Sequence, residues 1–181
     1  IDPHLYRASE GDVAKLANAN IIFYHGLHLE SKMIDIFDKM KKRKKTVAIT
    51  HTLDTNKLHK PESYEGYYDP HIWFDIPLWS KTVDSVTTAL IEYSPENKDY
   101  FTTQSNRYKK ELDALHKWII KTLEPLNKDK RILVTAHDAF GYFGSAYAFE
   151  VLGLQGISTE SEAGTKDVQD LAKTISDRQI P

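Results

Sequence analysis

The alternation of apolar and polar residues in the first half of the chain predicts two short strands joined through a helix. Ile21-Ile22-Phe23-Tyr24 and Thr46-Val47-Ala48-Ile49-Thr50 are apolar runs typical of buried strands. Between them, residues 29–41 place apolar side chains on one helical face. A strand, a helix and a strand within about 30 residues form a βαβ unit, which we expect to be parallel and right-handed.

Three further helices are predicted around this unit. Ser9, followed three residues later by Asp12, is typical of an N-cap and should open a short helix through residue 17. Pro77 suits a first helical turn, and residues 78–93 continue as a helix. The longest helical pattern covers about residues 96–123, and at 1.5 Å per residue it would span ~40 Å. That is enough to connect the two halves of a small two-lobed protein.

A second α/β region is predicted near the end of the chain. A strand over residues 131–135 leads through an exit loop at 136–138 into a short helix over 139–147. Another apolar run covers 149–156, and a last helix covers 165–176. We expect the apolar side of that last helix to be buried: Val168, Leu171, Ala172 and Ile175.

The fold class that follows is α/β, with two lobes and one long helix between them. We expect residues 1–95 to form an N-terminal lobe, 96–126 a linker helix and 127–181 a C-terminal lobe. Two strand candidates cannot cover both faces of a sheet, so we expect the first lobe to lack its start and the second its end. The polar segment 51–68 is long for a connection in a compact domain, which predicts that it is either functional or mobile.

Charge and composition exclude several classes of partner. The net charge is −2, so the chain has no overall basic footprint for nucleic acid. The basic run 39–45 follows an amphipathic helix, where cations at a helix C-terminus are favourable. The absence of cysteine excludes disulfides and thiolate metal sites. No apolar run approaches the ~20 residues of a membrane helix.

One tripeptide occurs twice, as Asp2-Pro3-His4 and as Asp69-Pro70-His71. Proline fixes its own φ and holds the preceding Asp extended, and that Asp can close a turn with its side chain. Each histidine therefore leaves the backbone at a defined angle. His137 follows the strand predicted at 131–135, at the sheet edge where α/β proteins bind ligands. Three converging imidazoles would form a transition-metal site between the lobes, while solvated turn histidines are the alternative.

The chain also resembles the solute-binding proteins of zinc and manganese ABC importers, the ZnuA/TroA type. Five motifs carry this resemblance in order: Asp2-Pro3-His4-Leu5-Tyr6, Tyr24-His25-Gly26-Leu27-His28-Leu29-Glu30, Asp69-Pro70-His71-Ile72-Trp73-Phe74-Asp75, Thr135-Ala136-His137-Asp138-Ala139-Phe140-Gly141-Tyr142-Phe143 and Gly156-Ile157-Ser158-Thr159-Glu160-Ser161-Glu162-Ala163-Gly164. The resemblance implies two Rossmann-like lobes joined by one long rigid helix, with one divalent ion in the interlobe cleft. It implies that His4, His71 and His137 are metal ligands and that a fourth ligand, an Asp, lies beyond Pro181.

The resemblance also bears on the remaining polar side chains. It makes His25 and His28 part of a loop that opens a helix, without metal. We interpret His116, on the polar side of the long helix, as solvated. Glu160 and Glu162 have two open interpretations, which are orientation of a ligand imidazole and helix capping.

The function that the resemblance implies is capture of Zn(II) or Mn(II) outside the cytoplasmic membrane and delivery to an ABC-transporter permease. The protein would be a monomer, periplasmic or lipid-anchored on the outer face of that membrane, and not an enzyme. Because metal needs neutral imidazoles, affinity should fall as pH drops through ~6.5. The alternatives are a zinc-dependent hydrolase, with Asp138 as the nearest candidate base, and a surface adhesion protein. The choice between zinc and manganese stays open.

Overall fold

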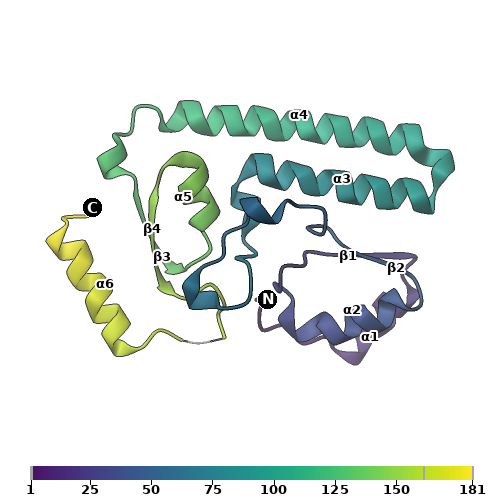
Figure 1. The fold of residues 1–181 in the computed structure, drawn as a ribbon, viewed down its shortest axis with the longest axis horizontal. Helices are drawn as coiled ribbons and strands as arrows, with labels where there is room; N and C mark the ends of the chain where they lie inside the picture. The colour runs from purple at the N-terminus through teal and green to yellow at the C-terminus, as the bar shows by residue number, and fades with distance from the viewer. Residues whose placement is uncertain (1, 161, 181) are drawn as a thin grey trace.

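Two small parallel sheets lie on opposite sides of the molecule in the computed structural model, which describes residues 2–160 and 162–180. In the first sheet β1 (Ile21–Tyr24) pairs with β2 (Lys45–Ala48), and in the second β3 (Ile132–His137) pairs with β4 (Glu150–Gln155) (Figure 1). Both pairs are parallel, so a helix must return the chain between the strands of each. The α/β class and the parallel βαβ unit predicted near the N-terminus are confirmed.

The first helix, α1 (Glu10–Asn18), begins where the sequence predicts. The Ser9 hydroxyl accepts a hydrogen bond from the backbone N–H of Asp12, and the Asp12 carboxylate accepts one from the backbone N–H of Ser9. This reciprocal capping satisfies two backbone donors that the first helical turn cannot use. The predicted N-cap is confirmed.

The second helix begins later than predicted. α2 covers Ile34–Lys41 and follows a 3₁₀ turn over Ser31–Met33, whereas the periodicity predicted a helix from residue 29. The reason is a turn in which Gly26, Leu27 and His28 all have positive φ, at 90°, 50° and 67°. The Glu30 carboxylate closes this turn by accepting hydrogen bonds from the backbone N–H groups of His25 and Gly26.

Three lysines of the basic run 39–45 lie at helix C-termini, as the sequence predicts. Lys39 and Lys41 lie in the last turn of α2. The Lys44 ammonium donates to the carbonyl oxygens of Ala17 and Ala19, at the end of α1. Positive charge is favourable there because the last carbonyls of a helix carry partial negative charge.

Two antiparallel helices form a layer that extends over both sheets (Figure 1). α3 covers Ile76–Tyr93, with Pro77 in its first turn and the Asp75 carboxylate accepting from the backbone N–H of Leu78. α4 covers Lys98–Leu123 and starts two residues later than predicted, because Pro95–Asn97 forms a 3₁₀ turn. The predicted long helix is confirmed, and it packs along α3 before it reaches the second sheet.

Residues 51–68 contain two 3₁₀ turns, Thr55–Lys57 and Glu62–Tyr64, and they contribute to the core. One cluster joins this segment to distant parts of the chain, and its buried members are Leu53, Leu58, Ile72, Leu78 and Tyr142. Tyr142 belongs to α5 (Gly141–Tyr147), which follows β3. The apolar core therefore includes residues from both predicted lobes.

The last helix, α6 (Thr165–Asp177), contradicts the sequence prediction about burial. Val168 is 48% exposed, Leu171 and Ile175 are half-buried, and Ala172 is exposed. The helix contacts β4 at the outer side of the second sheet, where it has few neighbours (Figure 1). The lobe boundaries predicted at residues 95 and 126 stay a prediction.

Gly153 offers a test of how tightly β4 packs against the chain after β3. A Cβ at Gly153 would lie 2.6 Å from the Asp138 Cβ and 2.8 Å from its Cα, so the backbone would have to move. We expect Gly153→Ala to lower the free energy of unfolding by about 1–3 kcal/mol in urea denaturation.

Gly11→Ala is the matched control for Gly153→Ala. Gly11 lies inside α1, and a Cβ there would meet only the Ser9 Oγ, at 3.7 Å. We expect this variant to raise stability by about 0.5 kcal/mol, because alanine loses less conformational freedom in a helix. Equal effects of the two substitutions would contradict the close contact at Gly153.

Candidate metal centre

The two Asp-Pro-His sequences form the same turn. Asp2 Oδ1 accepts a hydrogen bond from the backbone N–H of His4 at 2.9 Å, and Asp69 Oδ1 accepts one from the backbone N–H of His71 at 2.9 Å. These are the side-chain turns expected of an Asp two residues before its donor. The predicted role of each Asp in presenting its histidine is confirmed.

The structure brings the three predicted histidines to one point. The Nε2 atoms of His4 and His71 are 3.2 Å apart, and those of His137 and His71 are also 3.2 Å apart. The candidate ligand atoms of all three lie within 4.8 Å of one another. His4 and His71 are buried, while His137, the last residue of β3 and not a loop residue as predicted, is half-buried.

Hydrogen bonds at the opposite ring nitrogens determine which nitrogen is free. His71 Nδ1 donates to Asp69 Oδ1 at 2.7 Å, and His137 Nδ1 donates to the carbonyl oxygen of Gly156 at 2.8 Å. Because a carboxylate and a carbonyl only accept, Nδ1 carries the proton in the neutral form of each ring. Their Nε2 lone pairs therefore point toward the common centre, as a metal ion requires.

Burial favours the neutral form of His4 and of His137. Burial and the neighbouring His71 lower the pKa of His4 to about 4, and the same two causes lower the pKa of His137. Two imidazole nitrogens bound tetrahedrally at 2.0–2.1 Å would be about 3.3 Å apart, close to the 3.2 Å between these nitrogens. The donor set and its spacing fit a transition-metal ion.

Comparison with known proteins now gives the family. Residues 1–181 match the family model described as the periplasmic zinc-uptake complex component A, ZnuA. The chain belongs to this family. It is 43% identical over 180 residues to the manganese-binding lipoprotein MntA of Bacillus subtilis, covering 99% of this chain and 58% of that one.

Two solved structures share the fold of this ZnuA-family chain. The periplasmic zinc-binding protein TroA of Treponema pallidum is 45% identical, with a TM-score of 0.96 over 100% of this chain and 65% of that one. The laminin-binding protein Lmb of Streptococcus agalactiae, described as bifunctional in adhesion and metal transport, is 25% identical. Its TM-score is 0.84 over 98% of this chain and 65% of that one. The chain spans 58% of the length of MntA and of the curated TroA sequence.

The fourth ligand expected for a ZnuA-family site lies outside the described residues. Within residues 2–160 and 162–180, the group whose ligand atoms converge consists of His4, His71 and His137. The assignment of these three histidines as metal ligands stays a prediction.

His25 is buried close to the centre but has a different role. Its Nε2 donates to the carbonyl oxygen of Pro70 at 2.7 Å, and its ring lies against those of Trp73 and Trp79. The bond supports the backbone of the turn that presents His71. Sequence reasoning assigned His25 to a loop without metal and missed this support, since no local pattern indicates a partner 45 residues away.

The other four histidines have partners outside the centre. His28 stacks on Tyr67, His51 Nδ1 donates to the carbonyl of Ala48, and His59 stacks on Tyr142. His116 is half-buried and hydrogen-bonded through Nδ1 to the Tyr147 hydroxyl at 3.0 Å. The interpretation of His116 as solvated is therefore wrong, because α5 packs beside that side of α4.

Helix capping is wrong for Glu160. Its carboxylate contacts the Lys32 ammonium at 2.7 Å and accepts from the Ser31 hydroxyl at 3.2 Å. α6 begins after Gly164, whose backbone N–H donates to Asp167. Glu162 is exposed.

Asp138 is the candidate base of the hydrolase alternative. It lines an open cavity of about 380 Å³ whose other lining residues are His59, Lys60, Pro61, Asp69, Gly141 and Ile157. Burial and the charge of Asp69 raise the pKa of Asp138. None of the three converging histidines lines this cavity.

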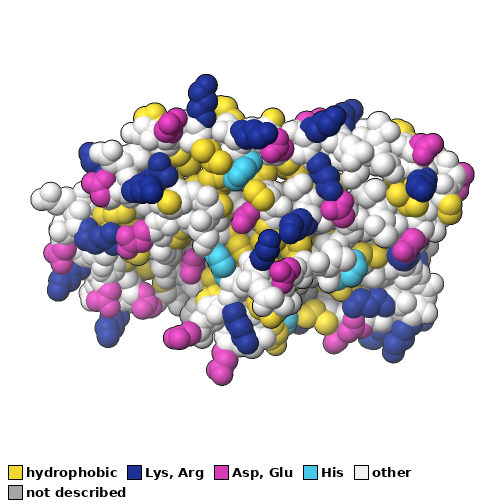
Figure 2. Space-filling view, turned by 45° about the horizontal axis from the view of Figure 1, so that its top comes forward, with side chains coloured by type: hydrophobic (Ala, Val, Ile, Leu, Met, Phe, Trp, Pro, Cys, Tyr) yellow, Lys and Arg dark blue, Asp and Glu magenta, His cyan; other side chains and the backbone are white. Residues whose placement is uncertain are grey.

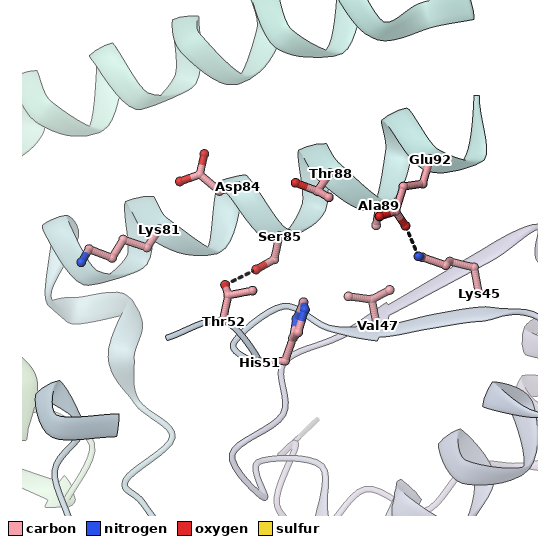
Figure 3. Close-up of a pocket in the computed structure, with 10 residues that line it drawn as sticks. All are labelled: Lys45, Val47, His51, Thr52, Lys81, Asp84, Ser85, Thr88, Ala89 and Glu92. Atoms are coloured by element: carbon pink, nitrogen blue, oxygen red, sulfur yellow. Dashed lines mark hydrogen bonds and ion pairs between the residues drawn. The ribbon is translucent and has the colours of Figure 1, made fainter. Parts of the chain in front are cut away.

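A larger cavity of about 500 Å³ lies between β2 and α3, away from the histidine centre (Figure 3). Two pairs of its lining side chains contact each other: Lys45 pairs with Glu92, and the Thr52 and Ser85 hydroxyls bond at 2.6 Å. Among the described residues, His51 is the only histidine that lines it, and the converging ligand atoms lie elsewhere, at His4, His71 and His137.

The surface carries charges of both signs. On the face in Figure 2, Lys and Arg side chains are interspersed with Asp and Glu. This distribution accords with the net charge of −2 and gives that face no broad basic area. No helix among the described residues has the length and apolar character needed to cross a membrane.

Because His25 is buried, we expect the free energy of unfolding to fall as the solution is acidified. Burial lowers its pKa to about 4, so between pH 6.5 and 4 the unfolded chain binds this proton more readily. The contribution of neutral His25 to the free energy of unfolding is therefore complete above pH 6.5 and is lost as the pH falls toward 4. It amounts to about 3 kcal/mol at most, since one unit of pKa difference corresponds to about 1.4 kcal/mol.

We expect His25→Gln to remove part of this pH dependence, because the amide can still donate to Pro70 without titrating. The measurement is urea denaturation of the metal-free protein at pH 7, 6, 5 and 4. His51→Gln is the control, as His51 is exposed and also bonds to a backbone carbonyl. Parallel pH profiles for the parent and His25→Gln would contradict the assignment.

Proposed function

We propose that this protein captures Zn(II) or Mn(II) outside the cytoplasmic membrane and delivers it to an ABC-transporter permease. One observation carries the proposal: one ring nitrogen from each of three histidines lies within 4.8 Å of the others, and two of the rings are held in the tautomer that leaves Nε2 free. His4, His71 and His137 are the ligands in this proposal. The names of the related MntA and TroA, manganese-binding and zinc-binding, support it.

The chemistry supports binding without catalysis. His71 and His137 are each fixed by a hydrogen bond at Nδ1, and two of the three rings are buried, so the ligands are organised before the ion arrives. The fourth ligand, an Asp beyond Pro181, would complete a tetrahedral set and leave no open position for an activated water. The family is a substrate-binding component of importers, which accords with this role.

Metal selectivity follows from the donor set. Three nitrogen ligands favour zinc over manganese in intrinsic affinity, because divalent affinities rise along the series from manganese to copper and remain high at zinc. We propose that zinc binds more tightly in a direct titration. The related MntA and TroA are named manganese-binding and zinc-binding, so the titration is made with both ions.

The proposed location is the periplasm, or the outer face of the cytoplasmic membrane through a lipid anchor. The family description names a periplasmic component, and MntA is named a lipoprotein. We propose that the protein acts as a monomer toward its permease. Release of the ion then requires a shift of the C-terminal part that moves His137 away from His4 and His71.

Adhesion is a second candidate function, favoured by one comparison. Lmb, which is described as having both adhesin and metal-transporting activity, matches this fold at 25% identity. Binding to a host or matrix protein that survives loss of all three histidines would support adhesion as a separate activity.

Metal binding tests the primary proposal directly. We expect one equivalent of Zn(II) in calorimetric titration of the protein at pH 7.5, and a loss in affinity of more than about 100-fold in His71→Ala. His51→Ala, which removes an exposed histidine outside the centre, should keep the parent affinity. Equal affinity of His71→Ala and the parent would contradict the proposed site.

The pH dependence of binding provides a second measurement. Protons compete with the metal for the imidazoles, so affinity should fall as the solution is acidified. Burial lowers the pKa of His4 to about 4 and lowers that of His137, so this competition moves to lower pH than the ~6.5 of a free imidazole. An affinity that is unchanged between pH 7.5 and 3.5, a range that extends below the pKa of His4, would argue against histidine ligation.

A further inference from the structure

One short segment, residues 156–160, contacts the structural supports of two of the three histidines. We infer that the Thr159 hydroxyl in this segment is a positioning group for His4, and that it slows dissociation of the bound ion. The inference rests on the proposed metal capture, and it concerns a side chain that does not itself touch the metal centre.

The first contact passes through Asp2. The Thr159 hydroxyl donates to Asp2 Oδ2 at 2.5 Å, while Oδ1 of the same carboxylate accepts the backbone N–H of His4 at 2.9 Å. These two residues are 157 positions apart in the sequence. Because one planar carboxylate takes both bonds, the orientation of Asp2 in the His4 turn is fixed by Thr159.

A second contact from the neighbouring residue reaches the same turn. The Ser31 hydroxyl lies 3.1 Å from the carbonyl oxygen of His4 and 3.2 Å from Glu160 Oε1. Glu160 also pairs with Lys32 at 2.7 Å. Ser31 has one hydroxyl proton for these two acceptors, so the bond from Thr159 through Asp2 is the contact that connects the segment to the backbone of His4.

The other end of the segment holds His137. The carbonyl oxygen of Gly156 accepts from His137 Nδ1 at 2.8 Å, and the next residue, Ile157, is only 4% exposed. Ile157 therefore anchors the segment between its two polar ends. A contiguous run of five residues connects the ring of His137 to the turn that presents His4.

The physical consequence concerns the rate of release. His71 is fixed by Asp69 within its own turn, whereas His4 relies on a carboxylate that is only half-buried and held from a distant segment. Opening the Thr159–Asp2 bond lets the His4 turn move without disturbing the core. We expect this opening to precede departure of the ion, so the bond affects dissociation more than association.

The test compares two substitutions at Thr159. Thr159→Val removes the hydroxyl at nearly constant shape, and Thr159→Ser keeps the hydroxyl and removes a methyl group. Zn(II) dissociation is measured by stopped-flow transfer to a chromogenic chelator at pH 7.5. We expect the dissociation rate of Thr159→Val to rise about 10-fold with little change in association rate, and Thr159→Ser to stay within about twofold of the parent.

Lys41→Ala is the matched control, because it removes an exposed pairing with Asp38 far from the centre. It should leave the dissociation rate unchanged. Equal dissociation rates for the parent and Thr159→Val would overturn the inference, as would a Thr159→Ser rate as fast as that of Thr159→Val.

A metal-free measurement separates this inference from the proposed function. In imidazole ¹H–¹⁵N spectra of the metal-free protein, we expect Thr159→Val to shift the His4 signals and Thr159→Ser to restore them, with His51 and His116 unchanged. Unshifted His4 signals would overturn the positioning role. Shifted His4 signals in a protein that binds neither Zn(II) nor Mn(II) would keep the positioning role and overturn the proposed metal capture.

Discussion

The buried contact between Asp69 and His71 holds the rest of the centre in place. Asp69 Oδ1 accepts both the backbone N–H and the ring Nδ1–H of His71, and the two residues are 1% and 2% exposed. In such a low-dielectric environment a hydrogen bond to a carboxylate is strong. One oxygen atom of Asp69 therefore fixes the turn, the ring orientation and the tautomer of His71. The Nε2 atoms of His4 and His137 each lie 3.2 Å from the Nε2 atom of this ring.

The same residue connects the centre to the core. The backbone carbonyl of Asp69 accepts from the Tyr142 hydroxyl at 2.9 Å, and that hydroxyl also accepts from the backbone N–H of His59. Tyr142 is 1% exposed and belongs to the apolar cluster that unites residues before α3 with α5. The distance between His71 and His137 thus depends on a packed contact between the two halves, in addition to the histidine turns themselves.

The turns that present His71 and His4 are supported in different ways. His71 is supported by buried groups, including the His25–Pro70 bond, and its environment excludes water. His4 is itself buried, but Asp2, Thr159 and Ser31, which hold its turn, are half-buried. Under the proposed function, the protein must both retain an ion and release it. A rigid His71 beside a more weakly supported His4 would satisfy both requirements, because stability differs locally within one fold.

Most of the secondary structure and the candidate ligands could be predicted from the sequence, and the failures have physical causes. The Asp-Pro-His turns, the Ser9 cap and the long helix depend on local preferences of a few adjacent residues, so they are readable along the chain. The late start of α2 was missed because three consecutive residues with positive φ follow from the closure of the turn by Glu30. The exposure of α6 could not be predicted, because the spacing of apolar residues shows that the helix has an apolar face but does not show whether another element covers that face.

The sequence by itself determined which residue types could bind a metal and the local angle at which two of them leave the backbone. The tertiary structure decided that His4, His71 and His137 meet, and that the buried His25 does not join them. It also decided the partners of Asp2 and Asp69, on which the orientation of two rings depends. The reason is that convergence and tautomer depend on groups up to 157 residues apart, and chain proximity carries no information about such contacts.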